Sequence, residues 1–197
     1  MEHCFVIGML DNDISCKYLE LTLPEIERVT CIKPTIWNAV TPQTLPSGPL
    51  QFLKTKPTIG THRSRNLTDT EKSVWYSHFT LWNHVSMNCA SAWIFEHDID
   101  LSRIIVFPEY TSDIVTIKET GSVDCYYLTK RGATSLCHLA VSSPITFQVD
   151  GFLSSLITTR TTIKNMHFCP KLPIEQLTMF GTTIDHQPSS ATYHDQE

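Results

Sequence analysis

Ala92-Trp93-Ile94-Phe95-Glu96-His97-Asp98-Ile99-Asp100 is the stretch that decides the fold, because four apolar residues are followed by three carboxylates within five positions. A short apolar run with such an end is typical of a buried strand that reaches solvent. In open α/β sheets, ligands bind just beyond the carboxyl ends of the strands. Carboxylates there can share a divalent cation, which takes oxygen ligands and neutralises the charge of a diphosphate. The stretch predicts a divalent-cation site at Glu96, Asp98 and Asp100, with a solvated acidic loop or a helix cap as the alternative.

The segment before this strand has the pattern of an amphipathic helix. Thr68 and Glu71, three residues apart, form the sequence signature of a capping box. Apolar residues then recur at the spacing of one helical face as far as about Asn88. That face includes His78, which follows Ser77. We expect this pair either to orient the site or to be hydrogen-bonded within the core.

This helix and strand together resemble the core motif of the family 25 glycosyltransferases, which include lipooligosaccharide sugar transferases and collagen galactosyltransferases. The resemblance rests on Leu67-Thr68, Glu71, Ser77-His78, Leu81-Trp82 and Ile94-Phe95-Glu96-His97-Asp98-Ile99. Three more segments occur in the family's order: Trp37-Asn38-Ala39-Val40, Tyr126-Tyr127-Leu128-Thr129-Lys130-Arg131-Gly132-Ala133 and Gln148-Val149-Asp150. The match is densest over residues 67–100 and 124–152.

The chain also departs from the family pattern. His97 stands where the family has the middle acid of three, Asp69-Thr70 replaces a Pro-Gly turn, and the first strand lacks the family's Asn-Leu and later Arg. Because successive residues of a strand point to opposite faces, we expect His97 to face away from Glu96 and Asp98.

The resemblance implies a single α/β domain over residues 1–187, similar to the glycosyltransferase A fold of nucleotide-diphospho-sugar transferases, with a mixed, mainly parallel sheet flanked by helices. It implies transfer of a sugar, with inversion, from a nucleotide-diphosphate donor to a hydroxyl acceptor. The acceptor is expected to be a glycan, with a modified nucleobase as the other possibility. Mn²⁺ or Mg²⁺ would be held by Glu96, Asp98 and Asp100.

Asp150 is the candidate general base. It lies among apolar residues in the stretch 147–153, and an apolar environment raises the pKa of a carboxyl group toward that of a useful base. An inverting transfer needs only one base. The alternative role for Asp150 is N-cap of the helix that follows.

Donor-binding residues are expected in three places. Residues 3–9 form an apolar strand, and a helix capped by Asp13 or Ser15 follows it, so the turn between them can place amides against a nucleotide. The candidates in this turn are Gly8, Asp11 and Asn12, although a polar turn without a ligand fits equally well. A proline-rich loop over 41–66 is expected to be a lid or a disordered segment. Arg63 and Arg65 near its end match phosphate oxygens, with a solvated basic loop as the alternative. Lys130 and Arg131 begin a helix predicted to reach about residue 141. Positive charge is unfavourable at the start of a helix, and a nearby anion would offset it.

Strands are also expected at 104–107, 113–117 and 123–128.

Composition limits the class of protein. The 197 residues have a net charge of −5 and no run of more than two basic residues, which argues against a nucleic-acid partner. Seven cysteines without a C-x-x-C pair, no signal-peptide pattern and no long apolar run indicate a cytoplasmic protein without a membrane span. Residues 188–197 are polar and expected to be disordered.

Two other functions stay open: a non-catalytic nucleotide-sugar-binding protein of the same fold, and a virus-type glycosyltransferase acting on modified DNA bases.

Overall fold

The computed structural model describes residues 2–46, 67–104, 107, 112–117, 123–142, 145, 147–159, 166–168, 175–176 and 179. Its elements in chain order are β1 (Glu2–Gly8), α1 (Asp13–Thr30), β2 (Thr35–Asn38), α2 (Asp69–Asn88), β3 (Ser91–Glu96), β4 (Ile99–Asp100), β5 (Ile114–Thr116), β6 (Cys125–Thr129), α3 (Lys130–Ser142), α4 (Val149–Thr159), β7 (Met166–Phe168) and β8 (Glu175–Gln176).

An open sheet with the strand order β2-β1-β3-β6-β5-β7 forms the centre of the fold. β1 pairs in parallel with β2 and β3, and β5 pairs in parallel with β7, whereas β6 is antiparallel to both β3 and β5. Within the described chain, β6 alone therefore runs against the other strands of this sheet. A mixed α/β fold with helices flanking the sheet is confirmed.

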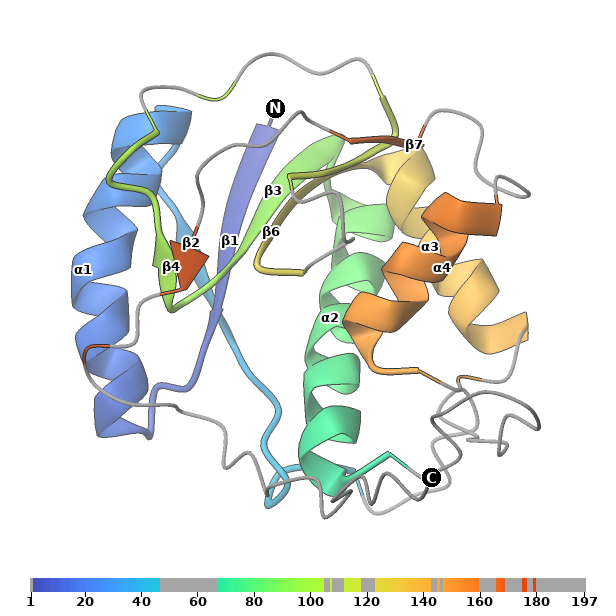
Figure 1. Ribbon diagram of the computed structural model, residues 1–197, viewed down its shortest axis with the longest axis horizontal. Helices are drawn as coiled ribbons and strands as arrows, with labels where there is room; N and C mark the ends of the chain where they lie inside the picture. Colours follow the sequence, from blue (N-terminus) through green and yellow to red (C-terminus); the bar gives the residue numbers. More distant parts are fainter. Residues whose placement is uncertain are drawn as a thin grey trace, which may run out of the picture.

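Helices cover both faces of the sheet, as Figure 1 shows: α1 lies on one side, and α2, α3 and α4 lie on the other. Alternate residues of β1 divide between the two faces. Phe5 and Ile7 pack with Trp75 and Leu81 of α2, whereas Cys4 and Val6 pack with Leu19 and other buried residues of α1. The period-2 alternation of a strand thus gives two cores, one on each face.

The two long helices begin at side-chain caps. Thr68 accepts a hydrogen bond from the Glu71 amide and Glu71 accepts one from the Thr68 amide, so the predicted capping box of α2 is confirmed. For α1 the predicted cap was wrong. Asn12 is the N-cap and accepts a hydrogen bond from the Ser15 amide at 2.9 Å, while Asp13 lies in the first turn of the helix.

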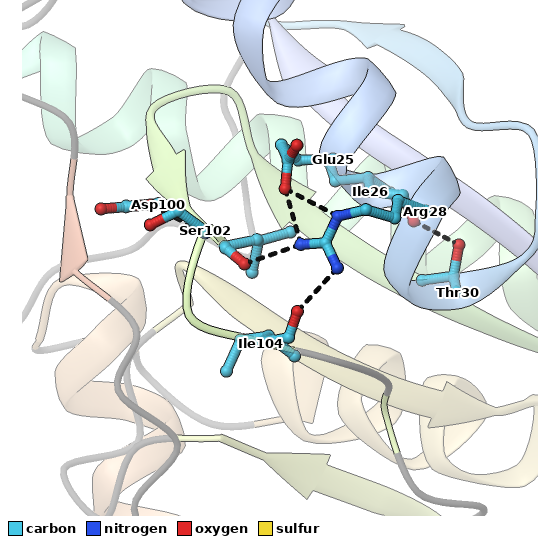
Figure 2. Close-up of polar contacts among 8 residues, drawn as sticks. Glu25, Ile26, Arg28, Thr30, Asp100, Ser102 and Ile104 are labelled. Atoms are coloured by element: carbon cyan, nitrogen blue, oxygen red, sulfur yellow. Dashed lines mark hydrogen bonds and ion pairs between the residues drawn. The ribbon is translucent and has the colours of Figure 1, made fainter.

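The predicted strand over 104–107 was also wrong at Ile104 and Phe107, its two described residues, which lie outside any strand. Both side chains are buried in the core beneath α1, so their apolar character serves packing without a sheet ladder. Figure 2 shows how this segment is held: Arg28 of α1 donates to the Ile104 carbonyl at 2.9 Å and to Glu25 at 2.6 Å. Arg28 also donates to the Leu101 carbonyl at 3.1 Å, so α1 anchors the segment directly after β4.

Two further observations concern the described residues. No helix in the described ranges is both long enough and apolar enough to cross a membrane. The described cysteines, Cys4, Cys16, Cys31, Cys89, Cys125 and Cys137, are all free thiols.

Candidate active site

The carboxyl ends of β1, β2 and β3 meet at one edge of the sheet. In the register, Gly8 pairs with Asn38 and Ile7 pairs with Glu96. The amino end of the antiparallel β6 reaches the same edge, where the Glu96 amide donates to the Asp124 carbonyl at 2.8 Å. One residue earlier, the Val123 amide donates to Asp150 Oδ1 at 2.7 Å. Glu96 and Asp150, which are far apart in sequence, therefore lie at the same edge.

The Glu96 carboxylate faces α2. Its Oε1 lies 3.5 Å from His78 Nε2, and the Glu96 side chain keeps 20% of its surface exposed. His78 is fully buried, and burial lowers the pKa of its imidazole to about 3. The imidazole is therefore neutral at neutral pH.

Tyr126 of β6 completes this buried cluster, and the sequence analysis assigned it no role. Its hydroxyl lies 2.7 Å from His78 Nδ1 and 2.8 Å from Trp82 Nε1. Burial raises the pKa of Tyr126 well above its usual value, so the phenol stays protonated. The alternation of side chains along a strand could have identified Tyr126, because it lies on the α2 side of the sheet while Tyr127 packs with Trp93 on the other face. On α2, Trp82 follows His78 by one helical turn, so both side chains lie on the same side of that helix.

Ser77 serves a different segment from its neighbour His78. Its hydroxyl accepts a hydrogen bond from the Val40 amide at 2.8 Å and donates to the Ser73 carbonyl at 2.9 Å. Val40 follows β2, so Ser77 ties the exit of β2 to α2. The adjacent residues of the Ser-His pair thus connect one helix to two different strands of the same edge.

His97 lies on the α1 side, as its position in the strand predicted. Its ring packs edge-on against Tyr18 with centroids 5.9 Å apart, and its carbonyl accepts a hydrogen bond from Thr22. Burial lowers the pKa of His97. The charge of Asp98 and a hydrogen bond with the Ile7 backbone act in the opposite direction and raise it, but burial has the larger effect. The substitution of the family's middle acid therefore affects packing on α1 rather than the face that carries Glu96.

The three predicted metal ligands differ in their surroundings. Asp100 Oδ1 accepts a hydrogen bond from the Ser102 amide at 2.9 Å, and this interaction lowers the pKa of Asp100. Across the described ranges, no group of three or more His, Cys, Asp or Glu side chains is arranged to hold a metal ion. A site that relies on three protein ligands does not fit this arrangement. Mg²⁺ commonly uses one or two carboxylates together with substrate phosphates, so a site with fewer than three protein ligands stays a prediction.

Asp150 occupies the first turn of α4 rather than its N-cap, and it is exposed. The prediction that Asp150 is the N-cap was therefore wrong, and so was the prediction that apolar residues surround its carboxyl group. Its carboxylate instead accepts a hydrogen bond from the Val123 amide at the sheet edge. Two contacts from α2 place the start of α4. Trp75 Nε1 donates to the Phe147 carbonyl at 2.8 Å, and Gln148 donates to Glu71.

The turn after β1 is stabilised by its own hydrogen bonds. The Met9 amide donates to Ser15 Oγ at 2.8 Å, and the Asn12 carboxamide is used as the helix cap. A Cβ on Gly8 would lie 3.0 Å from a methyl group of Leu19, so the glycine allows β1 and α1 to pack closely. Asp11 is exposed on the same turn. These contacts account for Gly8 and Asn12 without a ligand.

The structure does not bring Lys130 and Arg131 to this edge. Lys130 and Arg131 follow Thr129, which pairs with Ser91 at the opposite end of β3. There Arg131 Nε donates to Asp113 Oδ2 at 2.7 Å, so Asp113 is the anion that offsets the basic start of α3. Arg63 and Arg65 lie outside the described residues, as does the loop beyond residue 46 and the tail at 188–197.

Comparison with known protein families gave one result. Residues 25–107 match the model of glycosyltransferase family 25, described as an LPS biosynthesis protein. The resemblance inferred from the sequence is confirmed over this segment, which is less than half of the chain and contains α2, β3 and the acids from Glu96 to Asp100. A match to this family implies glycosyltransferase activity. The search of curated proteins found no match.

Proposed function

We propose that this chain is a metal-dependent, inverting glycosyltransferase that moves a sugar from a nucleotide-diphosphate donor to a hydroxyl acceptor, on a fold of the glycosyltransferase A type. The family match over α2 and β3 supports the reaction class. The observation that carries the proposal is the approach of two carboxylates to one sheet edge. Glu96 ends β3 and its amide donates to the Asp124 carbonyl, while Asp150, in the first turn of α4, accepts a hydrogen bond from the Val123 amide.

In this proposal Glu96 and Asp98 hold Mn²⁺ or Mg²⁺, which when bound neutralises charge on the departing nucleotide diphosphate. Asp100 is left out of the ligand set because its carboxylate accepts a hydrogen bond from the Ser102 amide in a tight turn. The Glu96 side chain keeps 20% of its surface exposed to solvent, while His78 limits its movement on the buried side.

Asp150 accepts the proton of the acceptor hydroxyl. Its exposed position allows an acceptor to reach it directly, and the hydrogen bond from the Val123 amide orients its carboxylate. A base must lie within hydrogen-bond reach of the proton that it removes, and an exposed carboxylate at the edge that carries Glu96 meets this requirement. Inversion needs no covalent intermediate, in keeping with a single base.

The nucleotide of the donor is placed at the turn between β1 and α1. Of the three candidates in that turn, Asp11 is the one whose side chain is exposed, and a carboxylate there can accept hydrogen bonds from ribose hydroxyls. Gly8 contributes close packing of the helix and Asn12 contributes the cap, so their role toward a donor is indirect.

Hydrolysis of UDP- and GDP-sugars with and without Mn²⁺ tests the proposal. We expect slow release of nucleotide diphosphate that depends on Mn²⁺ and is lost in Asp98→Ala. Nucleotide-sugar binding without release from any donor would favour a non-catalytic binding protein of the same fold.

A further inference from the structure

The hydrogen bonds around Tyr126 have a defined direction. The indole Nε1–H of Trp82 can only donate, so the Tyr126 hydroxyl accepts this bond. The single proton of that hydroxyl is then directed to His78 Nδ1, 2.7 Å away. In a neutral imidazole one nitrogen carries the proton and the other accepts, and therefore the proton of His78 is on Nε2.

This Nε2–H faces the end of β3. Within the described chain, His78 Nε2 is buried and has no hydrogen-bond acceptor at normal distance, and Glu96 Oε1 lies 3.5 Å from it. The opposite tautomer would direct the lone pair of Nε2 at the carboxylate and leave the Tyr126 proton without an acceptor. The arrangement with Nε2–H satisfies more of the buried polar groups.

We propose that Trp82, Tyr126 and His78 form a directional relay that positions the Glu96 carboxylate at the sheet edge, with His78 Nε2–H as the group that holds it. The proposal rests on the function proposed above, in which Glu96 binds the cation of the donor. Trp82, Tyr126 and His78 are completely buried and come from only two elements, α2 and β6, so the relay has little freedom to rotate. Groups that orient a metal-binding side chain in this way typically change metal affinity or activity about 10-fold to 100-fold when they are removed.

Two substitutions of His78 separate the contact with Glu96 from the contact with Tyr126. The amide nitrogen of Gln reaches about as far as Nε2, whereas that of Asn reaches about as far as Nδ1. We expect His78→Gln, which keeps a donor toward Glu96 but loses the contact with Tyr126, to lower the affinity for Mn²⁺, measured calorimetrically in the presence of UDP or GDP, by about 10-fold, as Tyr126→Phe does. We expect His78→Asn, which also loses the donor toward Glu96, to lower it further, toward about 100-fold. Equal losses in the two variants, or a smaller loss in His78→Asn, would overturn the role of the Nε2–H group.

The tautomer itself is measured without any ligand. Long-range ¹H–¹⁵N NMR of the imidazole groups, with the His78 signal identified by its absence in His78→Gln, should show a neutral ring protonated on Nε2. In Tyr126→Phe the Nδ1 resonance should shift because its hydrogen-bond donor is gone. A His78 ring protonated on Nδ1 in the wild-type chain would exclude the relay proposed here.

Tyr127→Phe is the matched control, since it removes the same hydroxyl from the next residue of β6, whose ring packs on the other face of the sheet. We expect Tyr126→Phe to lower Mn²⁺ affinity about 10-fold while Tyr127→Phe leaves it unchanged. Equal affinities in the two variants, with normal binding by the wild-type chain, would overturn the positioning role alone. A wild-type chain that binds Mn²⁺ with neither nucleotide would overturn the proposed function, and with it this role of the relay.

Discussion

The indole of Trp75 donates a hydrogen bond to the Phe147 carbonyl at 2.8 Å, which joins the middle of α2 to the turn that begins α4. Three residues after Phe147, Asp150 meets the sheet edge through the Val123 amide. α2 therefore places the candidate base as well as the surroundings of Glu96, through different side chains of one helix.

Trp75→Phe should lower the free energy of unfolding without changing the fold. The substitution keeps most of the buried ring surface but leaves the part-buried Phe147 carbonyl without its donor, which costs about 1 kcal/mol. Urea unfolding of the variant and the wild-type chain measures this difference. Trp37→Phe, at a half-buried position of the edge strand β2, serves as the control and should have a smaller effect. Identical midpoints for Trp75→Phe and wild type would show that the bond contributes nothing.

Asp98→Ala should abolish Mn²⁺-dependent binding of a nucleotide diphosphate, because a site with two carboxylates loses half of its protein charge. Asp100→Asn is the matched control. Its amide oxygen can still accept the hydrogen bond from Ser102, so the turn should persist and affinity should change little. Calorimetric titration with Mn²⁺ and UDP or GDP distinguishes them. Retained affinity in Asp98→Ala would remove Asp98 from the ligand set.

Asp150→Asn should keep the fold and lose turnover. The Asn side-chain oxygen can accept the hydrogen bond from the Val123 amide, but the amide cannot take a proton, so kcat should fall on the order of 10²-fold to 10⁴-fold. Asp150→Ala should in addition destabilise the chain by about 1–3 kcal/mol, since Val123 is buried and its amide would lose its partner. A stable Asp150→Asn variant with the wild-type transfer rate would exclude Asp150 as the base.

The metal-free protein should lose stability as the pH falls below 6.5, the ordinary pKa of histidine, because burial holds the pKa of His78 at about 3 in the folded chain. Between these two values the unfolded chain binds a proton at this position and the folded chain does not, so unfolding is favoured by acid. Free energies of unfolding of the wild-type chain and of His78→Gln, measured over this pH range, test whether stability falls with falling pH because of His78. The variant should show a shallower dependence on pH, and parallel curves would contradict the assignment to His78.

Alkylation should distinguish the thiols by exposure. Cys31, at the end of α1, is exposed, whereas Cys4 in β1 is buried and burial raises the pKa of its thiol to about 12. Because the thiolate is the reactive form, iodoacetamide should modify Cys31 long before Cys4 in the folded chain. Peptide mass spectrometry over a time course measures the order. Modification of both thiols at the same rate would show that the sheet around β1 opens readily.

Local patterns predicted those elements that depend on neighbours in sequence. The capping box of Thr68 and Glu71 places the start of α2, and the apolar run before Glu96 places β3, as both signals are complete within a few residues. The same logic failed for 104–107, where an apolar run packs beneath α1 without strand partners at its described residues. An apolar run is equally compatible with a strand and with a buried irregular segment, and only the available partners decide between them.

The sequence by itself determined the helix and strand that carry Ser77, His78 and Glu96, the alternation that turns His97 toward α1, and the family resemblance over this segment. Tertiary structure alone decided which of the candidate residues meet. Asp150 reaches the edge with Glu96, and Tyr126 reaches His78, because β6 returns antiparallel beside β3. The same reversal carries Lys130 and Arg131 to the far end of the sheet, beside Asp113. Strand order and direction arise from long-range pairing, which no local spacing of residues encodes.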